Sequence, residues 1–118
     1  LKEVCDRFDA SWYPRYKKWC DDYFTITHRH EMRGVGGIFY DHLRPGRAAS
    51  RHDLFAFMQG VGDVFNTIYT FMAEQNRHKS WTEEEKTWQK IRRGRYAEFN
   101  LVYDRGTTFG LKTNGRVE

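Results

Sequence analysis

The strongest constraint on the fold is a stripe of apolar residues that recur at spacings of three and four. Its members are Leu54, Met58, Val61, Phe65, Ile68 and Met72. Because an α-helix makes one turn in 3.6 residues, this spacing places the stripe on one face of a long helix. The sequence therefore predicts a helix that begins at Ser50 or His52, after a turn at Pro45-Gly46, with the stripe packed in the core.

Two further segments have helical signals. Residues 9–24 start at a possible capping residue, Asp9, and place Pro14 in the first turns, where its missing N–H does little harm. The apolar face of this segment consists of Trp12, Tyr16, Trp19, Cys20 and Tyr23. The second segment begins with overlapping capping boxes at Ser80 and Thr82, and Gly94 is expected to end it. Trp88 and Ile91 are expected to face the core.

The sequence predicts three extended segments. Residues 38–40 are β-branched and aromatic and follow a glycine-rich stretch. From Tyr96 to Tyr103 the apolar residues alternate with period two, with Ala97, Phe99, Leu101 and Tyr103 on one side. Residues 109–111 resume an extended run, and Asn114-Gly115 signals a hairpin turn. Helices and strands in this order predict an α+β fold in which helices flank an antiparallel sheet.

Composition narrows the class of protein. The chain has 118 residues, enough for one domain, and 17% of them are aromatic, which argues against disorder. No apolar run is long enough to span a membrane. Two cysteines without CxxC spacing indicate reduced thiols in the core of an intracellular protein. Lys plus Arg is 20 and Asp plus Glu is 16, so the net charge is +4. This positive net charge is compatible with binding an anionic ligand or nucleic acid, but it is also common for proteins whose charged residues only face solvent.

Candidate functional residues gather in two parts of the sequence. The first holds His28, Arg29, His30, Glu31 and Arg33, and the second holds Arg92, Arg93, Arg95, Glu98, Asn100, Asp104 and Arg105. Arginines bind carboxylates through two parallel hydrogen bonds, and a carboxylate can pair with a protonated nitrogen. The arginines and carboxylates of these two stretches together favour a small ligand that carries several carboxylates.

Simpler interpretations stand beside this one. Asp104, before Arg105-Gly106, is typical of a turn former, and arginines near the ends of elements are commonly surface residues. His28 and His30 on an extended segment would point to opposite faces, so they make a poor metal pair. The stretch RRGRYAEF has the composition of an RNA-stacking surface, although Glu98 and the run Glu83–Glu85 weaken that reading.

Long motifs also resemble a known family. The stretch YPRYKKWCDDYFTITHRHEMRGVGGIFYDHL is similar to the YYPRFKKWCDEYF, HRGE, RG and GGIFFDDL segments of oxygen-dependent coproporphyrinogen III oxidases. The stretch WQKIRRGRYAEFNLVYDRGTTFGLKTNGR is similar to their WQ, RRGRY, EFNLVYDRGT, FGLKT and GGR segments. Order and spacing match across nearly the whole chain. The resemblance implies that residues 1–118 form a single partial domain, an interior segment of a longer oxidase.

The resemblance implies an enzyme of haem biosynthesis. It converts two propionates of coproporphyrinogen III to vinyl groups, with molecular oxygen as oxidant, and yields protoporphyrinogen IX, carbon dioxide and hydrogen peroxide. It implies a homodimer with a large antiparallel sheet and no cofactor, although a divalent metal is attributed to some bacterial members. The expected compartment is the cytoplasm, with the mitochondrial intermembrane space as the alternative. No nucleic-acid partner is expected.

Matching motifs carry the family's site residues onto this chain. The resemblance implies that Asp104 meets the pyrrole N–H groups and that Arg105 meets a propionate. It implies substrate contacts by Arg29, Arg33, Asn114, Gly115 and Arg116. It offers His28 as a weak metal candidate; otherwise no metal ligand is expected. The segment from Tyr96, with Glu98, Phe99 and Leu101, is expected to form the dimer contact.

The chain departs from the family pattern at several positions. His30 replaces the glycine of HRGE, and His42 replaces the second aspartate of FDDL. A histidine proposed as proton donor belongs to an HFNYR-like motif that these 118 residues do not contain. Two other functions therefore stay open, a non-catalytic module that binds porphyrins or anions and a basic aromatic RNA-binding module.

Overall fold

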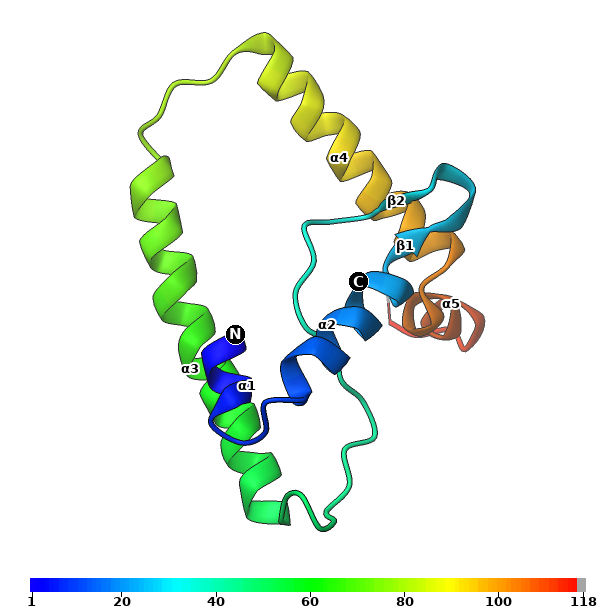
Figure 1. The fold of residues 1–118 in the computed structure, drawn as a ribbon. Coiled ribbons are helices and arrows are strands. Elements are labelled where there is room, and N and C mark those ends of the chain that lie inside the picture. The colour runs from blue at the N-terminus through cyan, green and yellow to red at the C-terminus, as the bar shows by residue number, and fades with distance from the viewer. Residues whose placement is uncertain (117–118) are drawn as a thin grey trace. The chain divides into compact units, whose positions relative to one another are not determined.

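The structure is a computed structural model that describes residues 1–116 (Figure 1). Its elements are α1 (Lys2–Asp6), α2 (Trp12–Tyr23), β1 (Thr25–Ile26), a 3-10 turn (Thr27–Arg29), β2 (Glu31–Met32), α3 (Arg51–Asn76), α4 (Glu83–Val102) and α5 (Arg105–Lys112). The fold is α+β, as predicted, with a two-stranded antiparallel sheet. No helix within residues 1–116 is long and apolar enough to cross a membrane.

The chain divides into two compact units. The first contains Leu1–Cys20 and Gly37–Ser80, and the second contains Asp21–Gly36 and the described residues from Trp81 onward. The last three residues of α2 therefore belong to the second unit, while the rest of that helix belongs to the first. Each unit has its own aromatic centre, so each is described by itself.

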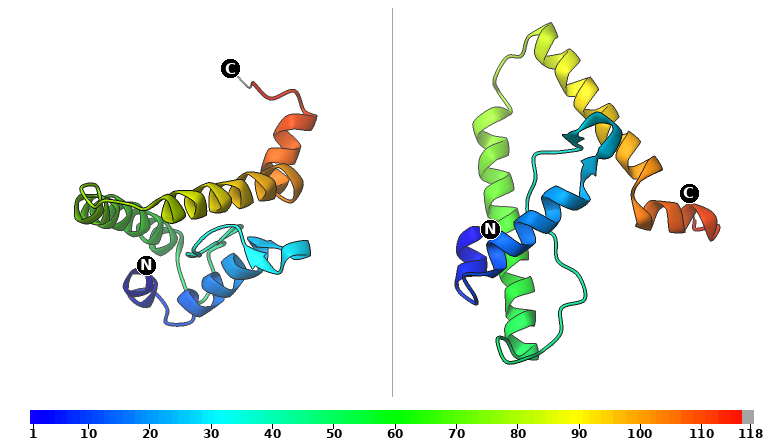
Figure 2. Two further views of the ribbon diagram at one scale, coloured as in Figure 1. Left: turned by 90° about the horizontal axis from the view of Figure 1, so that it is seen from above. Right: turned by 45° about the vertical axis from the view of Figure 1, so that its right-hand side comes forward.

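The core of the first unit forms around Phe57 of α3. Its ring is fully buried and contacts four aromatic rings, those of Phe8, Trp12, Tyr16 and Tyr40, at centroid distances of 5.0 to 6.0 Å. Such rings bury large areas, so a few of them suffice for a core in a chain this polar. Helix α1 packs beside α3 (Figure 2). The approach is close at Gly60, where an added Cβ would lie 3.3 Å from Cγ1 of Val4.

The predicted start of the long helix at Ser50 and the predicted capping box at Thr82 are confirmed. The Ser50 hydroxyl accepts from the N–H of Asp53, whose carboxylate accepts from the N–H of Ser50. Thr82 and Glu85 make the same reciprocal pair at the start of α4. The predicted helix over 9–24 is confirmed as α2 within a few residues of its ends. The predicted burial of Cys5 and Cys20 is confirmed as well.

The prediction that the whole apolar stripe lies in the core was wrong. Leu54 is buried and Val61 is half-buried, but the other members of the stripe are exposed: Met58, Phe65, Ile68 and Met72. The prediction that Trp88 and Ile91 face the core was wrong in the same way. Periodicity identifies the face of a helix that prefers burial, but other elements decide whether it is covered.

The predicted strand at residues 38–40 is not formed. The segment is extended but pairs with no strand among the described residues, and the N–H of Phe39 donates to the carbonyl of Tyr16 at 3.1 Å. Ile38 and Tyr40 pack against the core of the first unit. Its two preceding glycines, Gly36 and Gly37, have φ of 109° and 148°, which explains the need for glycine there.

The predicted strands after residue 95 were also wrong. Helix α4 continues through Gly94 to Val102, and residues 109–111 lie within α5. Asn114 is left-handed with φ of 54°, and the N–H of Gly115 donates to the carbonyl of Gly110, so this pair closes a helix rather than a hairpin. A strand needs a neighbouring edge for its backbone hydrogen bonds, whereas a helix satisfies them within the segment. The β1–β2 hairpin was not predicted.

Candidate functional site

The candidate site lies in the second unit, where the β1–β2 hairpin meets the C-terminal half of α4. Thr25 pairs with Met32, and Ile26 with Glu31, while His30 closes the turn in the left-handed conformation. β1 contacts α4 directly (Figure 2). This arrangement joins the two sequence regions with candidate residues, because hydrogen bonds link His28, Arg29 and Arg33 to side chains of α4.

His28 bridges Glu98 of α4 and Tyr103, the residue that follows this helix. Its Nε2 lies 2.7 Å from Oε1 of Glu98, and its Nδ1 lies 2.7 Å from the hydroxyl of Tyr103. Nε of Arg29 donates to the other Glu98 oxygen at 2.8 Å. The hydrogen bond from Arg29, together with that from His28, lowers the pKa of Glu98. Glu98 is therefore held as a carboxylate between two basic side chains.

Arg33 occupies an aromatic box in the same unit. Its guanidinium carbon lies 4.1 Å from the ring centroid of Phe24, 4.7 Å from that of Tyr96 and 5.1 Å from that of Phe99. NH1 donates to Oδ1 of Asn100 at 2.8 Å. A hydrogen bond with Asn100, followed by the charge of Arg33, lowers the pKa of Tyr96. Arg33 thus helps to hold the hairpin on α4 through cation–π contacts.

Asp104 caps α5. Its Oδ2 accepts from the N–H of Thr107 at 2.9 Å and from the Thr107 hydroxyl at 2.7 Å. Oδ1 accepts from the hydroxyl of Tyr23 at 3.2 Å. The hydrogen bond from the Thr107 hydroxyl is the main cause that lowers the pKa of Asp104. Asp104 therefore caps a helix, close to the role of turn former that its position in the sequence also suggested. Its carboxylate is ionised and half-buried, and it contacts the hydroxyl of Tyr23.

Two of the α4 arginines pair with the hairpin. NH1 of Arg92 lies 3.1 Å from Oε2 of Glu31, and Arg95 pairs with the other carboxylate oxygen. Arg92 also donates to the carbonyl of Met32. Arg93 lies over the ring of Tyr96 in the same helix, with its guanidinium carbon 4.5 Å from the centroid. Arg92 and Arg95 thus fix the hairpin against the helix.

The remaining predicted site residues lie outside this network. Arg105 is exposed at the start of α5, and its N–H lies 3.5 Å from the Tyr23 hydroxyl. Asn114, Gly115 and Arg116 follow α5 and are exposed. The hydrogen bonds that join the hairpin to α4 do not involve them. No site role was predicted for Thr107, or for Tyr23, whose contact with Asp104 spans 81 positions and leaves no local signal.

A divalent metal does not fit the residues of this site. No group of three His, Cys, Asp or Glu side chains within residues 1–116 could hold an ion. Both ring nitrogens of His28 lie within hydrogen-bond distance of Tyr103 and Glu98. No step of the chemistry is therefore assigned to a metal.

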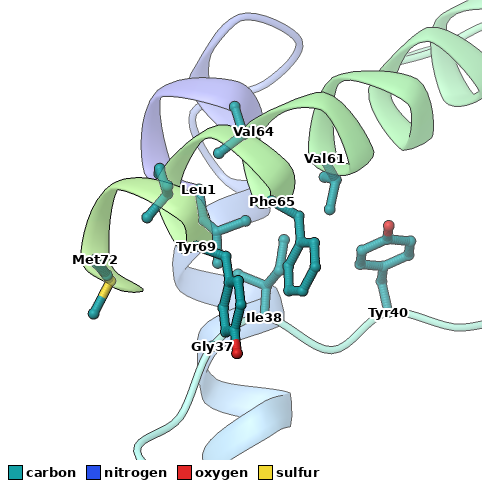
Figure 3. Close-up of a pocket in the computed structure, with 10 residues that line it drawn as sticks. Leu1, Gly37, Ile38, Tyr40, Val61, Val64, Phe65, Tyr69 and Met72 are labelled. Atoms are coloured by element: carbon teal, nitrogen blue, oxygen red, sulfur yellow. The ribbon is translucent and has the colours of Figure 1, made fainter. Parts of the chain in front are cut away.

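The first unit contains a separate apolar pocket of about 460 Å³. Figure 3 shows Phe65 and Tyr69 of α3 on one side and Ile38 and Tyr40 of the extended segment on the other. The rings of Phe65 and Tyr69 stack at 5.7 Å. No Lys or Arg lines this pocket, so it has no partner for the carboxylates of an anionic ligand.

Comparisons with known proteins cover the whole chain. The family model described as "Coproporphyrinogen III oxidase" matches residues 1–118. An oxygen-dependent coproporphyrinogen-III oxidase of Rickettsia rickettsii is 54% identical over 118 residues, 100% of this chain and 41% of the relative. Coproporphyrinogen-III oxidase 1, chloroplastic, of Arabidopsis thaliana is 53% identical over 117 residues, 99% of this chain and 30% of the relative. The chain thus spans well under half the length of these relatives.

Proposed function

Since the chain belongs to the coproporphyrinogen III oxidase family, we propose that the full-length protein decarboxylates coproporphyrinogen III oxidatively to protoporphyrinogen IX in haem biosynthesis. Molecular oxygen is the oxidant and no organic cofactor takes part. The observation that carries this proposal is the match of the whole chain to the family at more than half identity. We propose the cytoplasm as its compartment, and the mitochondrial intermembrane space is the alternative.

The second unit provides groups suited to this substrate. The ionised carboxylate of Asp104 can accept hydrogen bonds from pyrrole N–H groups. Arg105, exposed beside it, can bind a propionate through two parallel hydrogen bonds. Arg29 and Arg33 already have partners in Glu98 and Asn100, so they reach a propionate only if the substrate shares or replaces those contacts. Asn114, Gly115 and Arg116 would approach the ligand from beyond α5.

An RNA-binding function is not favoured. Two of the three arginines of RRGRYAEF, Arg92 and Arg95, are half-buried and paired with Glu31, and Arg93 is the exposed one. A surface that neutralises phosphates needs exposed cations. A non-catalytic module that binds porphyrins is the alternative for the 118 residues by themselves.

Exchanging Arg105 for lysine tests the proposed propionate contact. An ammonium behaves as a point charge and cannot reproduce the two parallel hydrogen bonds of a guanidinium. In the full-length protein, Arg105→Lys is expected to weaken binding of coproporphyrin by roughly 1–2 kcal/mol. The measurement is a fluorescence titration at two salt concentrations.

The matched control is Arg47→Lys, at an exposed arginine of the first unit. It should change binding by less than about 0.5 kcal/mol. Equal losses at the two positions would contradict the propionate contact. Equal losses that grew steeply with falling salt would instead favour diffuse electrostatic attraction between the basic surface and the anionic ligand.

We also propose a homodimer that uses the segment from Tyr96 to Tyr103. Leu101 is 66% exposed and is the clearest candidate for the contact, whereas Phe99 is 1% exposed and packs inside the second unit. Large apolar side chains of this kind favour association when they are exposed. Tyr96 and Glu98 flank Phe99 and complete the proposed segment.

The full-length protein is expected to sediment as a dimer, and Leu101→Arg is expected to shift it toward the monomer, because a charge in the contact must lose its water. Val35→Arg, at a fully exposed position outside the segment, is the control and should stay dimeric. Analytical ultracentrifugation over a range of concentrations measures both. A monomeric wild type, or a Leu101→Arg dimer of unchanged stability, would contradict the proposed contact.

A further inference from the structure

We propose that a basic pocket in the first unit binds a small phosphate monoester, a phosphate group joined to a compact organic part. The pocket has a volume of about 470 Å³, and Arg15, Arg44 and Arg47 are among the residues that line it. All of its lining residues belong to the first unit. The inference goes beyond the proposed function, because the substrate of that reaction carries carboxylates and no phosphate.

The pocket forms where the segment that leads into α3 passes α2 (Figure 1). Leu43 packs against the core of the first unit, and Ala49 is buried in that core. Between them, the N–H of Gly46 donates to the carbonyl of Ala49 at 2.9 Å and closes a turn that contains Arg47. The backbone that carries Arg44 and Arg47 is therefore anchored on both sides.

Two of the three arginines have their charge available for a ligand. Arg44 and Arg47 are exposed, and within residues 1–116 neither forms an ion pair or a side-chain hydrogen bond. Arg15 is held in place, because its NH2 donates to the Tyr16 hydroxyl at 2.8 Å and its guanidinium carbon lies 4.7 Å from the Tyr16 ring centroid. Like charges around one pocket repel each other, so an anion bound among them is stabilised.

Carboxylates do not neutralise this pocket. No Asp or Glu in the part of the chain that the structure describes lines it. Asp41 has its carboxylate 3.4 Å from Nε2 of His42, and Asp53 accepts hydrogen bonds from the N–H and the hydroxyl of Ser50. A bound anion would therefore compete with no carboxylate of the lining.

The lining favours a phosphate over a carboxylate. A carboxylate has one charge and two oxygens in one plane, so a single guanidinium can bind it through two parallel hydrogen bonds. A phosphate monoester carries nearly two charges and three terminal oxygens that point in different directions, so it can engage several guanidinium groups.

The rest of the lining favours an organic part on that phosphate. Trp12, Leu43 and Leu54 also line the pocket and offer apolar surface. The volume of about 470 Å³ lies within the range of small-molecule sites and leaves room beside the phosphate. A compact apolar group there would bury surface that inorganic phosphate leaves in water.

Calorimetric titration of the full-length protein in phosphate-free buffer tests the ligand class. Phenyl phosphate and benzoate share a ring, so their comparison isolates the anionic group. Phenyl phosphate is expected to bind with a Kd below about 1 mM, benzoate at least ~10-fold more weakly, and inorganic phosphate more weakly than phenyl phosphate. Absence of saturable binding by phenyl phosphate, or equal binding of benzoate, would overturn the proposal.

Variants locate the binding in the pocket. Arg44→Gln and Arg47→Gln each remove one charge from the lining and are expected to weaken phenyl phosphate binding roughly 10-fold. Arg51→Gln is the matched control, because Arg51 is exposed in the same unit but does not line the pocket. It should change the Kd less than about 2-fold. Equal losses in all three variants would show attraction by net charge and would contradict a pocket.

Competition separates the pocket from the proposed substrate site. Saturating coproporphyrin is expected not to displace phenyl phosphate, because its anionic groups are carboxylates. Displacement would place phenyl phosphate at the substrate site and overturn the inference. None of these titrations requires turnover, so failure of the proposed oxidase activity is a separate result from failure of the pocket.

Discussion

Asp104→Asn in the full-length protein is expected to lower kcat at least ~10-fold, which corresponds to about 1.4 kcal/mol of transition-state stabilisation. The substitution removes the negative charge that is proposed to face the pyrrole N–H groups. Asparagine caps helices about as well as aspartate, so α5 should keep its start. The measurement is steady-state turnover of coproporphyrinogen III with parallel circular dichroism.

Two comparisons separate charge from structure. Thr107→Val removes the hydroxyl that contacts Oδ2 of Asp104 but keeps the carboxylate, so it should change kcat far less than Asp104→Asn. The pKa of Asp104 is lowered in the folded chain, so its carboxylate stabilises the fold above the ordinary aspartate pKa, and this stabilisation is lost as the pH falls through the folded pKa. Because asparagine has no titratable carboxylate, Asp104→Asn should remove this loss of stability at low pH. Normal turnover by folded Asp104→Asn would leave Asp104 as a capping residue alone.

Phe57→Ala is expected to lower the free energy of unfolding by about 3–5 kcal/mol. The Phe57 ring is fully buried, and the alanine variant leaves a cavity among the rings of Trp12, Tyr16 and Tyr40. This is a large share of the stability of an ordinary domain, which is about 5–15 kcal/mol. Urea unfolding of the 118-residue chain, followed by tryptophan fluorescence, measures the loss.

Phe55→Ala is the matched control, because Phe55 lies on the same helix and is 60% exposed. It should change the free energy of unfolding by less than about 0.5 kcal/mol. A loss at Phe57 no larger than that at Phe55 would show that the first unit is not built around the Phe57 ring. Phe57→Leu should fall between the two, because it retains part of the buried volume.

Helix starts were the structural features that the sequence predicted best. Ser50 and Asp53, and likewise Thr82 and Glu85, satisfy backbone groups within three residues of themselves. Such signals depend on no distant contact, so they can be recognised without the tertiary structure. The family could also be identified from the sequence, because long motifs such as EFNLVYDRGT keep their order and spacing.

The candidate site was predicted as a set of residues but not as an arrangement. Both His28 and Glu98 were among the predicted residues, yet nothing in the sequence indicates that they meet, since 70 positions separate them. The hairpin that carries His28 was missed because its strands have two residues each, too few to show alternation. Tyr103 was assigned only to the apolar side of a strand.

The sequence by itself determined where the capped helices begin, which residues of α2 and α3 share an apolar face, and which family the chain belongs to. Only the tertiary structure decided that residues 96–102 continue α4 and that Phe65 stays exposed on α3. The physical reason is the range of the interactions. A cap or a helical hydrogen bond is completed within four residues, whereas a strand needs another edge and an apolar face needs a second surface. Neither partner can be read from the segment that requires it.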